Sequence, residues 1–263
     1  ENFRQGSLER LGYGYQELRR LRPDLIYVSM PAFGNSGPWR RYVAYGIGQE
    51  QLSGMAHMTG YPGDGPMKSG INHGDPITGS HAAGVVLAAL RQRRRTGLGR
   101  YIDVSQQESA VSLIGAEVLE FQVNGQEPPR RGNHSPHWAP HNAYPCAGED
   151  RWIAIGCSSD AHWEGLQRTI APDGSGWPYN PDFTTLLGRK AKEDELERLL
   201  SDWTSSWEPG ALMETLQSSG VPAGMVNDCR DLFDDAQLQH RGHFQWLDHP
   251  EIGPYATDAS EMH

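Results

Sequence analysis

Residues 25–41 read LIYVSMPAFGNSGPWRR, and this stretch indicates the fold class. Its first six residues are mostly apolar and partly β-branched, as in a buried strand. A helix is expected just before it, over residues 15–21, because Arg22-Pro23 ends the helical pattern. A helix, a buried strand and a Gly-, Pro- and Asn-rich loop form one step of a doubly wound α/β sheet. Because such sheets bind ligands at the carboxyl ends of their strands, residues 31–41 are a candidate functional loop.

The composition is that of a globular protein without a general affinity for nucleic acid or membranes. The chain has 263 residues, with 23 Lys or Arg against 33 Asp or Glu, for a net charge of −10. A mean hydropathy of −0.63 argues against a membrane-embedded protein. Three cysteines are too few for a disulfide framework, so the cytoplasm is the expected location. Cys157 is interpreted as a buried residue rather than a nucleophile. The opening at Glu1 and the ending YATDASEMH predict a chain truncated at both ends.

A second α/β pattern follows a Pro-rich connector, which predicts two domains. Residues 126–145 contain five Pro and no regular periodicity, as expected of a linker or an active-site loop. The predicted strands are 25–30, 101–104, 151–157 and 221–226, and the predicted helices are 15–21, 46–58, 81–90, 105–125, 160–170, 193–203, 209–218 and 228–240. We assign residues 1–125 to a large domain, 126–145 to the linker, 146–230 to a small α/β domain and 231–263 to a segment returning toward the large domain.

A carboxylate flanked by small residues is the first candidate catalytic group. Residues 68–90 read KSGINHGDPITGSHAAGVVLAAL, where Asp75 lies between Gly74 and Gly79, just before the apolar helix expected at 81–90. Small neighbours leave room for a ligand to reach this carboxylate, which could act as a base or as a covalent nucleophile. The alternative is that Asp75 only caps the helix N-terminus, a common task for Asp at such a place. The residues alone leave both interpretations open.

Three loop histidines and a run of arginines are weaker candidates. His134, His137 and His141 are spaced by three and four residues, with Cys146 beyond them, which suggests a metal site. The intervening prolines prevent a shared helical face and no paired Cys motif accompanies them, so solvated histidines are favoured and no metal is predicted. The run RQRRRTGLGR at 91–100 could bind phosphate, although such runs more often end a helix.

The order of several motifs resembles one known family. The motifs are ENFRQGSLERLG (1–12), RPDLIYVSMPAFGNSGP (22–38), AYGIGQEQLSGMAHMTG (44–60), GDPITGSHAAGVVLAALRQRRRTGLGRYIDVS (74–105), APHNAYPCAGEDRWIAI (139–155) and GVPAGMVNDCRDLFDDAQLQHRGHF (220–244). Their joint order is similar to that of the class III CoA-transferases of the CaiB/BaiF type, which include formyl-CoA transferase and have α-methylacyl-CoA racemase as a relative. The resemblance implies a Rossmann-like large domain, whose part before ENFR is missing here, and a smaller α/β domain. It also implies an interlocked homodimer for the full-length protein.

The resemblance further implies a reaction and its residues. Asp75 matches the catalytic aspartate of the family, which moves CoA from an acyl-CoA thioester to an acceptor carboxylic acid through an aspartyl anhydride and an aspartyl-CoA thioester. The CoA thioester is thus a substrate, and no permanently bound cofactor is implied. The implied substrate-binding residues are Asn2, Phe3, Arg10, Tyr45 and Gly74.

Three parts of the sequence bear on which reaction and substrates of the family are expected. Gly46 stands where transferases of the family have an acidic residue after the tyrosine. The glycine-rich loop of formyl-CoA transferase is replaced by residues 132–145, so oxalate and formate are not the expected substrates. A racemase would need a histidine base at Tyr45, whose phenol, with a pKa of about 10, is a poor substitute. CoA transfer is therefore favoured, with an acyl-CoA racemase or isomerase and an inactive CoA-binding fragment as alternatives.

Overall fold

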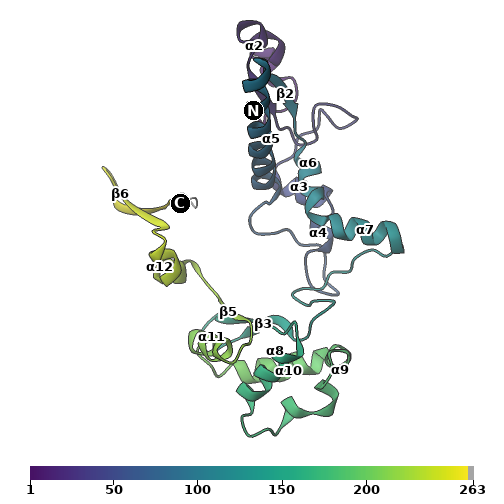
Figure 1. Ribbon diagram of the computed structural model, residues 1–263, viewed down its shortest axis with the longest axis vertical. Helices are drawn as coiled ribbons and strands as arrows, with labels where there is room; N and C mark the ends of the chain where they lie inside the picture. The colour runs from purple at the N-terminus through teal and green to yellow at the C-terminus, as the bar shows by residue number, and fades with distance from the viewer. Residues whose placement is uncertain (260–263) are drawn as a thin grey trace. The chain divides into compact units, whose positions relative to one another are not determined.

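The structure of the chain is a computed structural model that describes residues 1–259. It divides into two units, the first covering Glu1–Gly132 and the second beginning at Asn133 (Figure 1). The division falls within residues 126–145, where the sequence predicts a linker, and a strand begins at His141 inside that segment. The domain assignment as a whole stays a prediction.

The first unit contains a short parallel sheet connected through helices. Strand β1 (Ile26–Ser29) pairs with β2 (Arg100–Asp103), and Ile26 lies opposite Arg100. The helical elements are α1 (Ser7–Arg10), α2 (Tyr15–Leu21), α3 (Gly46–Leu52), α4 (Met55–Met58), α5 (Gly74–Thr96), α6 (Gln106–Val111), η1 (Ser112–Ile114) and α7 (Gly115–Asn124). Because parallel strands need a crossover connection, helices α3 to α5 lie between the two strands in the chain.

Helix α5 begins earlier than the sequence predicts. The expected helix starts at residue 81, whereas α5 starts at Gly74, so that Asp75 is its second residue. Pro76 is tolerated because the N–H groups of the first turn have no partner inside a helix. The Thr78 hydroxyl donates to the carbonyl oxygen of Gly74 at 2.7 Å. The buried residues of α5 are Gly74, Thr78, Ala82 and Ala89, whose small size permits the contacts that α5 makes with α3 and α6.

Three stretches expected as single helices are divided in the structure. The helix predicted at 46–58 breaks between α3 and α4, where Gly54 has a left-handed φ of 91°. The helix predicted at 105–125 is divided into α6, η1 and α7, and the one at 228–240 into α12 (Cys229–Asp234) and α13 (Ala236–His240). Asp235 breaks the last of these, because its extended backbone ends α12 while its carboxylate accepts from the Leu238 N–H and caps α13. Apolar periodicity identifies such stretches but does not locate these local breaks.

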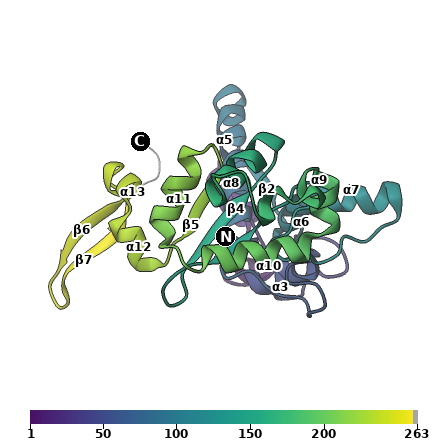
Figure 2. The same cartoon turned by 90° about the horizontal axis from the view of Figure 1, so that it is seen from below.

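The second unit has an antiparallel sheet in the order β3 (His141–Pro145), β4 (Trp152–Gly156) and β5 (Ala223–Val226). Along β4, Ile153 and Ile155 are buried whereas Trp152 is exposed, as the period of two in a strand requires. The helical elements are α8 (Asp160–Ile170), η2 (Trp177–Tyr179), η3 (Pro181–Phe183), α9 (Leu186–Ala191), α10 (Glu193–Thr204) and α11 (Pro209–Ser218). Helices α8, α10 and α11 gather around this sheet (Figure 2).

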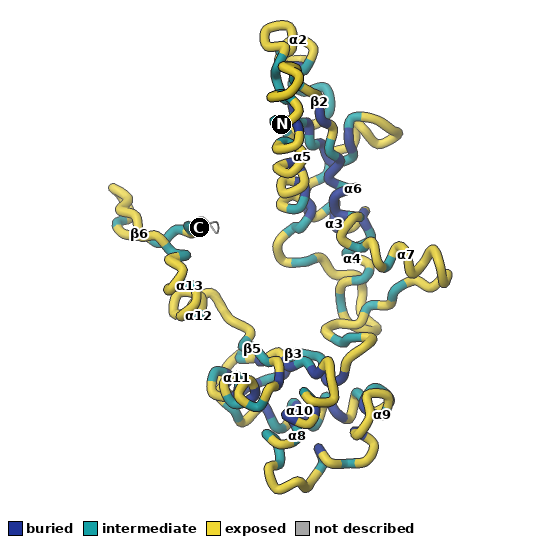
Figure 3. Tube along the Cα trace, in the orientation of Figure 1, coloured by how far each residue is buried: buried dark blue, intermediate teal, exposed yellow. Residues whose placement is uncertain are grey.

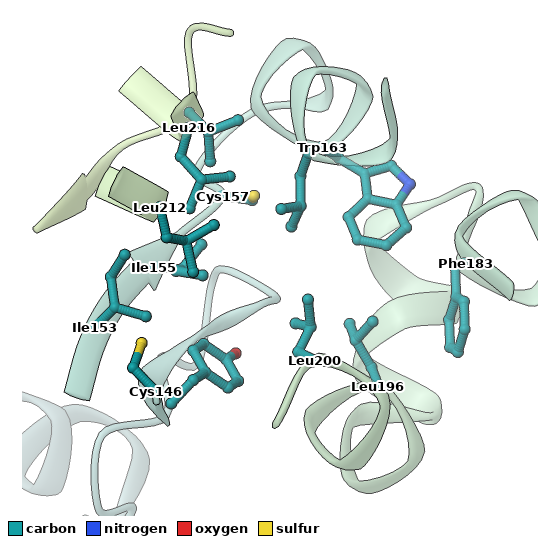
Figure 4. Close-up of a cluster of buried hydrophobic side chains, with 13 residues drawn as sticks. Cys146, Ile153, Ile155, Cys157, Trp163, Phe183, Leu196, Leu200, Leu212 and Leu216 are labelled. Carbon is teal, nitrogen blue, oxygen red and sulfur yellow. The ribbon is translucent and has the colours of Figure 1, made fainter. Parts of the chain in front are cut away.

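Most large buried apolar side chains belong to this second unit. They meet in one cluster of Tyr144, Cys146, Ile153, Ile155, Cys157, Trp163, Leu166, Phe183, Leu196, Leu200, Leu212, Leu216 and Val221 (Figure 4). In the first unit, by contrast, α7 has no buried residue and α5 buries only small ones, which Figure 3 shows as long exposed stretches. The first unit therefore leaves large apolar side chains such as Leu87 and Phe121 exposed.

The final segment is a β-hairpin preceded by two short helices. Strand β6 (Phe244–His249) pairs antiparallel with β7 (Gly253–Asp258). The Arg151 guanidinium donates to Asp231 of α12 at 2.8 Å, which ties the start of this segment to the loop before β4. None of the described helices is long and apolar enough to cross a bilayer.

Candidate active site

The Asp75 carboxylate lies against the backbone of α3. A Cβ placed on Gly46 would be 2.5 Å from Asp75 Oδ2 and 2.8 Å from the Cβ of Asn72, both too short for van der Waals contact. The carboxylate can therefore occupy this position only because residue 46 is glycine. Tyr45, the neighbour of Gly46, is 82% exposed, and Asp75 is exposed as well. The structure thus brings Asp75 to Gly46, across nearly thirty residues of sequence.

Asp75 does not cap its helix. The N-cap position of α5 is His73, and no side chain caps the helix there. Asp75 is the second helical residue, so its carboxylate lies in the first turn without bonding a first-turn N–H in the described part of the chain. The interpretation of Asp75 as a helix cap is therefore wrong. An anion in the first turn is still favoured by the helix dipole.

The segment leading into Asp75 is fastened to α3 by a buried carboxylate. Glu50 is 1% exposed and accepts from the Ser69 N–H at 2.9 Å, the Ser69 hydroxyl at 2.5 Å and the His73 N–H at 2.6 Å. Burial alone would raise the pKa of Glu50, but the hydrogen bonds from Ser69 and His73 outweigh it and leave that pKa below its usual value. Glu50 is therefore ionised at neutral pH.

Gln49 and Asn72 complete the surroundings of the helix start. Gln49 is fully buried, and a Cβ placed on Gly74 would lie 2.7 Å from the Cβ of Gln49. Asn72 has a φ of 53°, a left-handed conformation that is uncommon for residues other than glycine. Within residues 1–259, the Gln49 amide and the Asn72 Oδ1 are buried without a hydrogen-bond partner. Strained and unsatisfied groups of this kind are concentrated at functional sites.

A second candidate region is a cavity with four arginines. It has a volume of about 510 Å³ and is lined by Arg4, Gln5, Gly6, Glu9, Arg10, Asn35, Arg40, Arg41 and Tyr101. The Gln5 side chain donates to the carbonyl oxygen of Asn35 at 2.9 Å, which joins the N-terminal segment to the loop after β1. Four guanidinium groups against one carboxylate make this cavity cationic in a chain of net charge −10. Planar guanidinium groups suit phosphate, because they bind it through two parallel hydrogen bonds.

The sequence identified this cavity only in part. Of its four arginines, the sequence predicts a binding role only for Arg10, which stays a prediction, and it does not single out Arg4, Arg40 or Arg41. The available signal was the pair Arg40-Arg41 at the end of the candidate functional loop 31–41. Asn2 and Phe3 are exposed and do not line the cavity, and Gly74 is buried. The roles of these three residues in binding stay predictions.

The loop histidines are held by separate contacts. The His134 Nδ1 lies 3.7 Å from Glu193 Oε2, and the His141 Nδ1 lies 2.6 Å from the carbonyl oxygen of Asn133. No group of three or more His, Cys, Asp or Glu side chains within residues 1–259 could hold a metal ion.

The arginine run at 91–100 contains the end of a helix. Helix α5 ends at Thr96, and Arg93 Nη1 lies 3.8 Å from Asp24 Oδ2.

The three cysteines should differ sharply in reactivity. Cys157 is 1% exposed, and burial raises its pKa to about 12, while burial also raises the pKa of Cys146. Cys229 is exposed at the start of α12. Because the thiolate is the reacting form, we expect iodoacetamide at pH 8 to label Cys229 in the native protein and the other two only after unfolding. Native labelling of Cys157 at the rate of Cys229, measured by peptide mass spectrometry, would contradict its assignment as a buried residue.

The sequence matches a known family over nearly its whole length. Residues 1–262 match the profile of CoA-transferase family III. The chain belongs to this family. The resemblance drawn from the motif order is thus confirmed.

Curated relatives include several CoA-transferases. The chain is 32% identical over 256 residues to the succinyl-CoA–D-citramalate CoA-transferase of Chloroflexus aurantiacus, covering 96% of this chain and 62% of that protein. It is 30% identical over 243 residues to the succinate–glutarate CoA-transferase of Agrobacterium fabrum, covering 92% of this chain and 60% of that protein. The chain therefore spans less than two thirds of the length of these two relatives.

Solved structures agree with the family assignment. A CaiB/BaiF family protein from Brucella suis is 27% identical and superposes with a TM-score of 0.85 over 99% of this chain and 70% of that one. The chain Rv3272 of Mycobacterium tuberculosis, at 24% identity and a TM-score of 0.79, shares the fold. The predicted α/β class of the class III CoA-transferases is thus confirmed.

Proposed function

We propose that the protein is a CoA-transferase in which Asp75 is the covalent nucleophile. The observation that carries this proposal is an exposed Asp75 carboxylate in the first turn of α5, packed against the backbone of Gly46 and free of a capping role. The partial positive charge at the start of α5 favours an anion there and stabilises the negative charge that develops beside it. Membership of CoA-transferase family III supports the assignment.

The proposed reaction uses two kinds of covalent intermediate, mixed anhydrides and an aspartyl-CoA thioester. The Asp75 carboxylate attacks the thioester carbon of an acyl-CoA, the C–S bond breaks, and a mixed anhydride and the CoA thiolate result. The thiolate then attacks the aspartyl carbonyl of the anhydride, which releases the donor acid and leaves an aspartyl-CoA thioester. The acceptor carboxylate attacks the carbonyl of this thioester, the C–S bond breaks, and a second mixed anhydride and the CoA thiolate result. The thiolate then attacks the acceptor's carbonyl carbon in this anhydride, which gives the new acyl-CoA and restores the Asp75 carboxylate. Each step exchanges one activated acyl group for another, so no external energy source is needed.

The names of the relatives indicate a class of substrate. The two relatives described above are named for succinyl-CoA, D-citramalate, succinate and glutarate, which are dicarboxylic acids or a CoA thioester of one. We therefore propose a dicarboxylic acid as acceptor and a dicarboxyl-CoA such as succinyl-CoA as donor. The cavity containing Arg4, Arg10, Arg40 and Arg41 is the proposed site for the phosphates of CoA. The proposal extends to a homodimeric assembly and a cytoplasmic location, which rest on the resemblance and the composition.

Trapping of the acyl-enzyme tests this proposal. We expect the full-length protein, incubated with succinyl-CoA or glutaryl-CoA and quenched with hydroxylamine, to carry a hydroxamate on the peptide that contains Asp75. Hydroxylamine attacks the activated aspartyl carbonyl and releases the CoA thiol or the donor acid, so an unactivated carboxylate does not react. The peptide is identified by mass spectrometry, and protein that received hydroxylamine without acyl-CoA is the control.

Two results would contradict the proposal. The first is an unmodified Asp75 peptide although labelled succinate is incorporated into succinyl-CoA, because transfer would then proceed without the aspartyl intermediate. The second is deuterium incorporation at the α-carbon of a 2-methylacyl-CoA in D₂O without transfer, which would identify a racemase or isomerase.

A further inference from the structure

We infer that Glu50 is a positioning residue, which fastens residues 69–73 to α3 and so holds the Asp75 carboxylate at the backbone of Gly46. This inference rests on the proposed role of Asp75 as nucleophile. It assigns to Glu50 a task in catalysis that requires no contact with the substrate.

The hydrogen bonds to the Glu50 carboxylate all come from one short segment, residues 69–73. Its Oε1 accepts from the Ser69 hydroxyl and the His73 N–H, and its Oε2 accepts from the Ser69 N–H. A buried carboxylate is costly unless its charge is compensated, and no Lys or Arg forms an ion pair with Glu50 within residues 1–259. The three hydrogen bonds therefore stabilise the anion, and in return they fix both ends of the segment.

The segment needs such a restraint because its conformation is locally unfavourable. Asn72 lies between the two residues that Glu50 binds, and it has a left-handed φ of 53°. Its Oδ1 is buried without a hydrogen-bond partner in the described part of the chain. The left-handed backbone and the unpaired Oδ1 of Asn72 are both unfavourable. The segment would therefore relax to another conformation if the hydrogen bonds from Ser69 and His73 to Glu50 were lost.

The restrained segment bears directly on the position of Asp75. The Asp75 N–H donates to the carbonyl oxygen of Asn72 at 3.3 Å, and His73 is the N-cap residue of α5. Asn72 also packs against Gly46, at the place where Oδ2 of Asp75 lies. A shift of Asn72 would therefore move the start of α5 and displace the carboxylate. A displacement of about 1 Å at a reacting group can lower a rate by roughly 100-fold.

The Glu50→Gln substitution in the full-length protein tests the inference. The amide keeps the size of the side chain but places an NH₂ donor opposite the Ser69 or His73 donors, so at least one hydrogen bond is lost. We expect kcat for CoA transfer to fall by about 100-fold while KM for the acyl-CoA changes by less than about twofold, because the binding surface is untouched. We also expect faster hydrogen exchange at the Ser69 and His73 amides, whose hydrogen bonds weaken.

A matched control separates positioning from general destabilisation. Glu197 is partly buried and, like Glu50, accepts hydrogen bonds through both carboxylate oxygens, from the Asn142 amide and the Tyr144 hydroxyl in the second unit. We expect Glu197→Gln to leave kcat unchanged. Ser69→Ala, which removes one of the three donors to Glu50, should lower kcat by less than Glu50→Gln does.

Each outcome decides the inference. A folded Glu50→Gln protein with wild-type kcat would overturn the inference, even if hydrogen exchange at His73 became faster. The attachment of the segment would then have no effect on the catalytic position of Asp75. A rise in KM with unchanged kcat would overturn it as well, since it would indicate a binding role. If the wild-type protein transferred no CoA, the proposed function would fail and the catalytic role of Glu50 with it, whereas the exchange rates would still establish or refute the attachment.

Discussion

The Asp75→Asn substitution is expected to lower kcat for CoA transfer in the full-length protein by roughly 10⁴-fold or more. Asparagine has nearly the same shape as aspartate, so it fits against Gly46, but its amide is no nucleophile and forms no anhydride. Because Asp75 makes no capping hydrogen bond, the melting temperature should change little. The measurement is the rate at which labelled succinate enters succinyl-CoA, together with a thermal unfolding curve.

A control on the same unit makes this result specific. Asp64 is an exposed aspartate in the turn before α5, and its carboxylate makes no hydrogen bond or ion pair among the described residues. We expect Asp64→Asn to retain wild-type transfer. If Asp75→Asn retained transfer as well, the nucleophile would be another residue, and both the proposed mechanism and the role inferred for Glu50 would be wrong.

The Gly46→Ala substitution is expected to lower kcat by about 100-fold. The new Cβ would lie 2.5 Å from Asp75 Oδ2 and 2.8 Å from the Cβ of Asn72, so the carboxylate, the Asn72 backbone or both must move. The added methyl group is small, and Gly46 is distant in sequence from the second unit. We therefore expect the protein to remain folded. Steady-state kinetics with succinyl-CoA and far-UV circular dichroism measure the two effects.

Gly115→Ala is the matched control for this substitution. Like Gly46, Gly115 is the first residue of a helix, but a Cβ placed there has no neighbour within 4 Å. We expect its kcat to equal that of the wild type. Wild-type kcat in Gly46→Ala would show that the close approach to Asp75 has no part in catalysis.

Local patterns in the sequence were sufficient for most regular elements. The strand expected at 151–157 corresponds to β4, and the helix expected at 209–218 has the bounds of α11. These elements carry strong periodicity because they surround the apolar core of the second unit. The start of α5 was misplaced, because Gly74, Pro76 and Gly79 are weak helix formers whose placement in a first turn depends on contacts with α3.

The sequence by itself determined the family, through the order of its motifs, and it identified Asp75 as the candidate nucleophile. Whether Asp75 caps its helix was decided only by the tertiary structure, which places it in the first turn against Gly46. The attachment by Glu50 and the cavity of four arginines were likewise visible only in the structure. The physical reason is that propensity and periodicity act over a few neighbouring residues, whereas these contacts join segments about twenty to thirty residues apart, which meet only when the helices pack.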